Sequence, residues 1–212
     1  MKDREQTKEE EFTNAIIHGI GVILSIIAMV ILVFRAYHHG DSWHLVSFSI
    51  YGISLIMLYL ASTIYHSFPK GKWKNIFHII DHSSIFLLIA GTYTPFTLIP
   101  LRGPWGWSLF GAIWVIALTG IIAKTIWFDR VKALSVVLYV GMSWLVVIAI
   151  KPLIESVNNI SLIFLLTGGI FYTVGIIFYR WRRQKFAHAI WHVFVLAGSI
   201  LHFFGVYHLV EG

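Results

Sequence analysis

The chain has no cysteine and little charge, and both absences narrow the classes of protein to which it can belong. Without cysteine there are no disulfides and no thiolate metal sites, so metal ligands must come from His, Asp, Glu or backbone oxygens. Only 12% of the 212 residues are charged, against the usual ~25%, and 58% are hydrophobic. A water-soluble protein of this composition would expose large apolar patches, so the bilayer is the expected solvent.

The net charge of +6 does not indicate a nucleic-acid partner. In a membrane protein, a basic excess is typical of cytoplasmic loops that face anionic lipid heads. We therefore expect no nucleic-acid binding, and membrane lipid as the substrate or ligand. No pattern in the sequence sets an oligomeric state.

Seven segments are long and apolar enough to cross a bilayer, which takes about 20 mostly apolar residues. They do not alternate apolar and polar residues as barrel strands would, so the sequence predicts an all-α, integral membrane bundle of seven transmembrane helices. The expected spans are Ala15–Phe34, His44–His66, Ile79–Ile99, Trp105–Ile126, Val131–Ile150, Ile160–Tyr179 and Ala187–Leu209. Residues 1–14 are then a cytoplasmic N-terminal segment and residues 15–212 the transmembrane domain.

The basic residues indicate how the bundle is oriented. In a seven-span arrangement, thirteen of the sixteen Lys and Arg residues fall on one side: Lys2, Arg4, Lys8, Lys70, Lys72, Lys74, Lys124, Arg130, Lys132, Arg180, Arg182, Arg183 and Lys185. Only Arg35, Arg102 and Lys151 fall on the other. Because cytoplasmic loops are enriched in Lys and Arg, we expect the N-terminus in the cytoplasm and the C-terminus outside.

Three of the expected helices bring ionisable side chains to the same depth, near the cytoplasmic side. His66 ends the second span, Asp81 lies at the start of the third, and His188 and His192 lie at the start of the seventh. His188 and His192 are four residues apart, so they share a helix face about 6 Å apart along the axis. Ser62 lies one turn before His66. Ionisable side chains in a membrane are rare and mark functional sites.

Three neutral imidazoles with one open position form the ligand set of a catalytic zinc site. We expect His66, His188 and His192 to bind Zn²⁺, although imidazole also suits copper, nickel and iron. Asp81 is then a candidate general base for a water molecule or a partner that orients a ligand. Ser62 is a candidate donor to that water or to a substrate oxyanion. Such a set fits hydrolysis of an amide or ester.

Each of these motifs also has a structural explanation. A His–xxx–His pair near a helix end can be interfacial, solvated or hydrogen-bonded in the core. Asp81 and His82 can cap a helix, and Ser62 can hydrogen-bond to the preceding turn of its own helix. The shared depth of all members favours a metal site. The candidates for a supporting role around the ligands are His82, His78, Asn14 and His18.

Four stretches spread over the chain carry a family resemblance: Glu11–Gly19 (EFTNAIIHG), Ser62–Phe68 (STIYHSF), Asp81–Phe96 (DHSSIFLLIAGTYTPF) and His188–Phe194 (HAIWHVF). With them the chain resembles the progestin and adiponectin receptor family, specifically its bacterial hemolysin III group, in a superfamily that includes alkaline ceramidases. The resemblance implies a bacterial plasma-membrane bundle with a cytoplasmic-side zinc ion. The implied ligands are His66, His188 and His192, and the implied Ser and Asp are Ser62 and Asp81.

The sequence leaves three functions open. The first is a zinc-dependent membrane hydrolase, similar to an amidase or ceramidase, that acts on a lipid amide or ester. The second is a receptor-like regulator in which the zinc is structural. The third is a transporter or cytolytic pore, as the hemolysin name suggests, in which His and Asp form a proton or ion relay. The outer halves of the spans are apolar, which argues against a water-filled pore.

Overall fold

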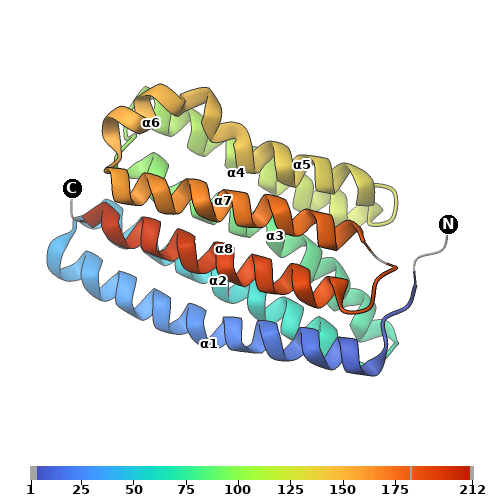
Figure 1. The fold of residues 1–212 in the computed structure, drawn as a ribbon. Helices are drawn as coiled ribbons and strands as arrows, with labels where there is room; N and C mark the ends of the chain where they lie inside the picture. The colour runs from blue at the N-terminus through green and yellow to red at the C-terminus, as the bar shows by residue number, and fades with distance from the viewer. Residues whose placement is uncertain (1–3, 182, 211–212) are drawn as a thin grey trace.

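The computed structural model describes residues 4–181 and 183–210, with the backbone alone at Lys132. Among these residues, seven helical spans are long and apolar enough to cross a membrane, which confirms the predicted all-α fold (Figure 1). The elements are α1 (Lys8–His39), α2 (Ser42–Ser67), α3 (Lys72–Leu98), α4 (Pro104–Trp127), α5 (Lys132–Trp144), η1 (Leu145–Ala149), α6 (Ile150–Ser156), α7 (Asn159–Arg180), α8 (Ala187–Tyr207) and η2 (His208–Val210).

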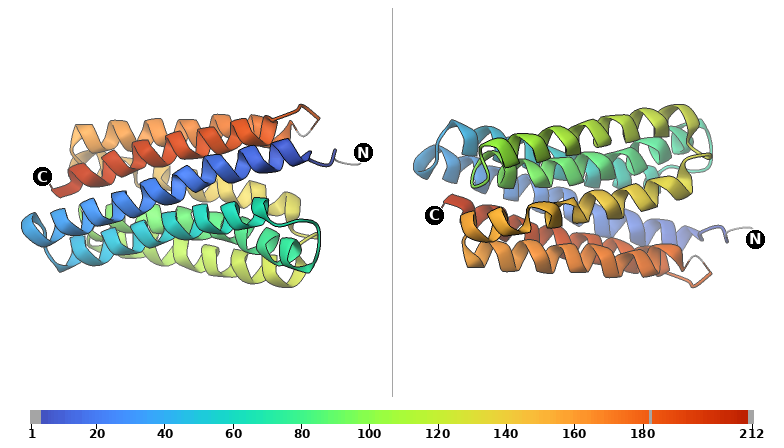
Figure 2. Two further views of the ribbon diagram at one scale, coloured as in Figure 1. Left: turned by 90° about the horizontal axis from the view of Figure 1, so that it is seen from below. Right: turned by 90° about the horizontal axis from the view of Figure 1, so that it is seen from above.

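Helices that follow one another in the chain mostly lie side by side. α1 packs on α2, α2 on α3, α3 on α4 and α7 on α8, and α8 also packs against α1. The two ends of the chain lie at opposite ends of the bundle, as an odd number of spans requires (Figure 2). α1 therefore lies between α2 and α8, and this arrangement places the first helix beside both helices that carry the candidate ligands.

Two helices, α1 and α3, begin seven residues earlier than the expected spans. α1 begins at Lys8 because Thr7 and Glu10 form a capping box, in which each side chain bonds the backbone N–H of the other residue. α3 begins at Lys72, so Asp81 lies well inside the helix. The interpretation of Asp81 and His82 as a helix cap is therefore wrong.

The fifth span is broken, whereas the sequence predicts one helix over Val131–Ile150. α5 ends at Trp144, a 3₁₀ turn follows, and the span continues as α6 to Ser156. The Tyr93 hydroxyl of α3 fills the break: it accepts the N–H of Val146 at 2.8 Å and donates to the carbonyl of Met142 at 2.8 Å. Backbone groups released in a membrane must find such partners.

The outer surface of the bundle is apolar, as contact with lipid requires. Large apolar side chains such as Ile23 and Val30 of α1 and Val115 of α4 are more than half exposed. One basic residue departs from the expected pattern: Lys124, counted above with a cytoplasmic loop, lies inside α4 and is buried, with its ammonium 4.5 Å from the centre of the Phe128 ring. The excess of Lys and Arg on the side expected to be cytoplasmic therefore depends on the other basic residues of that side.

Candidate metal centre

The three predicted ligand histidines lie together at one end of the bundle. His66 is in the last turn of α2, and His188 and His192 are in the first turns of α8. One nitrogen from each ring lies within 4.8 Å of the nitrogens offered by the other two. The ring centres are 5.3 Å apart for His66 and His188, 5.0 Å for His66 and His192, and 4.4 Å for His188 and His192. This cluster can bind a metal ion.

The hydrogen bonding of the rings fits a metal. His66 is 4% exposed and His192 2%, so both of these rings are shielded from solvent. Nε2 of His66 and Nδ1 of His192 are buried without a hydrogen-bond partner among the described residues. A buried polar atom without a hydrogen-bond partner destabilises the fold. A cation bound between the rings would give these two nitrogens a partner. Neutral imidazole is a favoured ligand of zinc, copper, nickel and iron.

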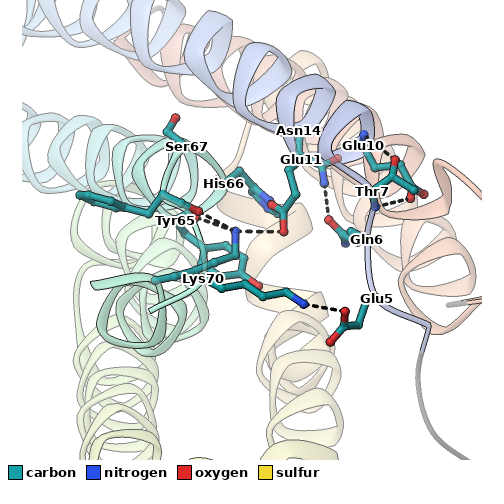
Figure 3. Close-up of polar contacts among 12 residues, drawn as sticks. Glu5, Gln6, Thr7, Glu10, Glu11, Asn14, Tyr65, His66, Ser67 and Lys70 are labelled. Atoms are coloured by element: carbon teal, nitrogen blue, oxygen red, sulfur yellow. Dashed lines mark hydrogen bonds and ion pairs between the residues drawn. The ribbon is translucent and has the colours of Figure 1, made fainter. Parts of the chain in front are cut away.

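A glutamate that sequence reasoning missed holds the first of these rings. Nδ1–H of His66 donates to Oε2 of Glu11 at 2.7 Å (Figure 3). Oε1 of Glu11 pairs with the Lys74 ammonium at 2.9 Å. The bond to His66 fixes its tautomer, so that the lone pair is on Nε2, as in carboxylate–histidine–zinc arrangements. Glu11, Asn14 and His18 are spaced i, i+3 and i+7 on one face of α1, a pattern that could have identified Glu11.

Asp81 and Ser62 lie beside the cluster. The Asp81 carboxyl of α3 is close enough to interact with both the Ser62 hydroxyl and the His66 ring. Thr63 and Ser67 of the same helix as Ser62 donate to carbonyls one turn back at 2.7 Å. Oγ of Ser62 is buried and makes no such bond within the described part of the chain, so the expected alternative of a back-bonded helical serine is wrong.

The four supporting candidates divide into two pairs. The His18 ring lies 3.6 Å from the His192 ring, centre to centre, and its two nitrogens have no partner among the described residues. Asn14, one turn earlier on α1, is fully buried and donates to the Gln6 side chain at 2.8 Å. His18 is thus part of the cluster of rings, and Asn14 links its helix face to the N-terminal segment.

His78 and His82 lie to one side of the cluster. Their rings contact each other at 4.7 Å between centres, and both contact the Phe128 ring. His78 also stacks on Tyr65 at 4.8 Å. Both histidines line a pocket that is also lined by His188. Their roles around a metal stay a prediction.

Two cavities lie near the histidine cluster, and Tyr179 lines both of them. A polar vestibule of about 300 Å³ is lined by His188 and by N-terminal residues such as Arg4 and Glu11. An apolar cavity of about 130 Å³ runs between α3, α5, α7 and α8, with Leu88 and Val195 among its lining residues. Tyr179 lines both, and its ring centre is 6.2 Å from that of His188. One candidate ligand, His188, therefore borders the polar cavity, and the neighbouring Tyr179 borders both cavities.

Comparison with known proteins gives consistent results over nearly the whole chain. A family model described as "Haemolysin-III related" matches residues 6–203. Hemolysin-3 of Bacillus cereus is 51% identical over 201 residues, which cover 95% of this chain and 92% of that protein. The hemolysin-3 homolog of Bacillus subtilis (strain 168) is 50% identical over 200 residues, 94% of each chain. Monocyte to macrophage differentiation factor of Homo sapiens is 27% identical over 207 residues, 93% of this chain and 83% of the human protein.

These similarities confirm the resemblance inferred from the four sequence stretches. The two Bacillus proteins cover the chain almost end to end, and the human protein connects it more distantly with the progestin and adiponectin receptor family. Together with the seven spans, they fit a multi-pass protein of the plasma membrane. The chain belongs to the haemolysin-III related family.

Proposed function

We propose that the protein is a zinc-dependent hydrolase of a lipid amide or ester and acts in membrane lipid homeostasis. The observation that carries the proposal is the cluster of His66, His188 and His192, with Asp81 and Ser62 beside it. His188 lines the polar cavity, and Tyr179, whose ring centre is 6.2 Å from that of His188, lines both the polar and the apolar cavity. The scissile bond of an amphiphilic substrate would need to lie between two such cavities.

The three imidazoles would bind the zinc ion, and Asp81 would act as the general base and acid. When bound, zinc supplies Lewis acidity and lowers the pKa of a water molecule at the site to about 7. The Asp81 carboxylate would accept a proton from the attacking water and return it to the leaving amine or alcohol. The Ser62 hydroxyl, which has no fixed partner in its own helix, donates to the carbonyl oxygen as negative charge develops there.

The two cavities give the substrate its orientation. A hydrocarbon chain is stabilised in the apolar cavity by roughly 0.8 kcal/mol per buried CH₂, and the polar end of the substrate remains in the cytoplasmic vestibule. Tyr179, which lines both spaces, is in contact with the substrate at the point where it changes from apolar to polar. The proposed substrate class is therefore a lipid with an amide or ester near its head group.

The proposal is tested with purified protein reconstituted in lipid nanodiscs. We expect one zinc ion per chain by metal analysis, release of fatty acid from ceramide-like amides or acyl esters, loss of this release on chelation, and recovery when zinc is added back. A protein that retains zinc but hydrolyses none of these lipids would contradict the proposal and favour a structural metal. Dye leakage from liposomes without hydrolysis would instead favour a pore.

A further inference from the structure

The start of α8 is held in an unfavourable backbone conformation. Phe186, the residue before the helix, has φ 58° and ψ 7°, and it is the one non-glycine residue with positive φ among the described residues. This left-handed region favours glycine and is rare for a bulky side chain. Phe186 also supplies no side-chain cap to the helix. Contacts from elsewhere must therefore hold the first turn of α8.

Glu10 of α1 provides such a contact from 176 residues away in the sequence. The backbone N–H of Phe186 donates to Oε1 of Glu10 at 2.8 Å. The Glu10 side chain is buried, and its other oxygen accepts the N–H of Thr7 at 2.9 Å (Figure 3). Arg4 forms an ion pair with the carboxylate. A carboxylate at a helix N-terminus also interacts favourably with the helix dipole. Glu10 thus acts as the cap that α8 lacks in its own sequence.

Glu10 and Glu11 together form hydrogen bonds to both helical segments that carry the candidate ligands. Consecutive residues of a helix point about 100° apart, and α1 lies between α2 and α8. Glu11 reaches α2, where it holds the His66 ring, and Glu10 reaches α8 just before His188. One turn of α1 therefore contacts the two sides of the cluster through two separate carboxylates.

We propose that Glu10 is a positioning residue for the metal centre: by capping α8 it fixes His188, and His192 one turn further, against His66. The inference rests on the metal site of the proposed function. Glu10 acts through the Phe186 turn, whose backbone N–H donates to its carboxylate two residues before His188. It therefore differs in kind from Glu11, which bonds a ligand directly.

Glu10→Gln is the most direct test, with Glu9→Gln as the matched control. Gln keeps the size of Glu but replaces one acceptor oxygen with a donor group, so one of the N–H groups of Phe186 and Thr7 loses its acceptor. We expect zinc affinity, measured by competition with a chromophoric chelator, to fall about tenfold, comparable with loss of an outer partner of a ligand. Glu9 is exposed and next in sequence, and its variant should bind zinc like the wild type. Equal affinities in all three proteins would overturn the inference.

Two further measurements separate this role from a general loss of structure. Phe186→Gly relieves the left-handed strain, so adding it to Glu10→Gln should restore most of the zinc affinity. A double variant that binds zinc as weakly as Glu10→Gln alone would contradict action through the turn.

Amide hydrogen exchange over residues 186–190, in protein without zinc, should be about tenfold faster in Glu10→Gln than in Glu9→Gln. If the wild type binds no zinc, the proposed function fails, whereas unchanged exchange in Glu10→Gln would overturn the capping role alone.

Discussion

Replacing His192 by alanine is expected to lower zinc affinity by more than about 100-fold. The ring supplies one of three nitrogens that lie within 4.8 Å of one another, and its removal leaves only a pair. Loss of an outer hydrogen-bond partner of a ligand costs 10–100-fold in affinity, so loss of a ligand itself should exceed that range. Competition titration with a chromophoric chelator on purified protein measures the effect.

Glu11→Gln removes the charge that orients His66, and it should lower zinc affinity by about 10–100-fold in the same titration.

His202→Ala is the matched control for this experiment. His202 is another buried histidine of α8, ten residues and about 15 Å further along the helix, and its Nε2 bonds the Leu165 carbonyl at 3.0 Å. Both substitutions remove a buried imidazole from the same helix, so they should disturb packing to a similar degree. His202→Ala should keep the zinc affinity of the wild type. Equal losses in the two variants would mean that zinc binding reports packing of α8, and that His192 is not a ligand.

Asp81→Asn is expected to reduce the turnover number about 10²–10⁴-fold while zinc stays bound. The substitution keeps the shape of the side chain but removes its ability to accept and return a proton, and general acid–base catalysis contributes an effect of this size. Asp81 lies beside Ser62 and His66 without belonging to the three-histidine cluster. Metal content and lipid hydrolysis measured on the same preparation separate the two effects.

Asp129→Asn provides the comparison for Asp81. Asp129 is exposed in the turn after α4, so the same chemical change there should alter neither zinc content nor turnover. If Asp81→Asn retained full turnover, the base role of Asp81 would be excluded. If it lost the zinc as well as the activity, Asp81 would be a metal ligand, and another group would have to move the proton.

The fold could be predicted because the bilayer imposes a simple rule on sequence. Each span needs a long apolar run, and the seven runs are separated by short polar connections, so their number and order follow from hydropathy. The break in the fifth span could not be predicted in this way, since Leu145–Ala149 is as apolar as the helix before it. It depends on the Tyr93 hydroxyl of a different helix, which takes up the released backbone groups.

The candidate site could be predicted in part for a similar reason. The direction in which each helix crosses the membrane places His66 and His188 at one depth. The i, i+4 spacing places His192 on the same helix face as His188. Depth gives no information on which side chains meet across helices. The contacts of Glu11 with His66 and of Glu10 with Phe186 depend on the packing of α1 between α2 and α8, which becomes apparent only in the folded chain.

X-ray absorption at the zinc edge of the purified wild-type protein tests most directly whether three imidazoles from α2 and α8 share one metal ion. We expect a first shell of nitrogen and oxygen at about 2.0–2.1 Å, with the outer-shell scattering of three imidazole rings. The His192→Ala variant, loaded at saturating zinc, should show the scattering of two imidazole rings. A zinc shell without imidazole scattering, or wild-type protein that retains no zinc when purified in its presence, would contradict the account.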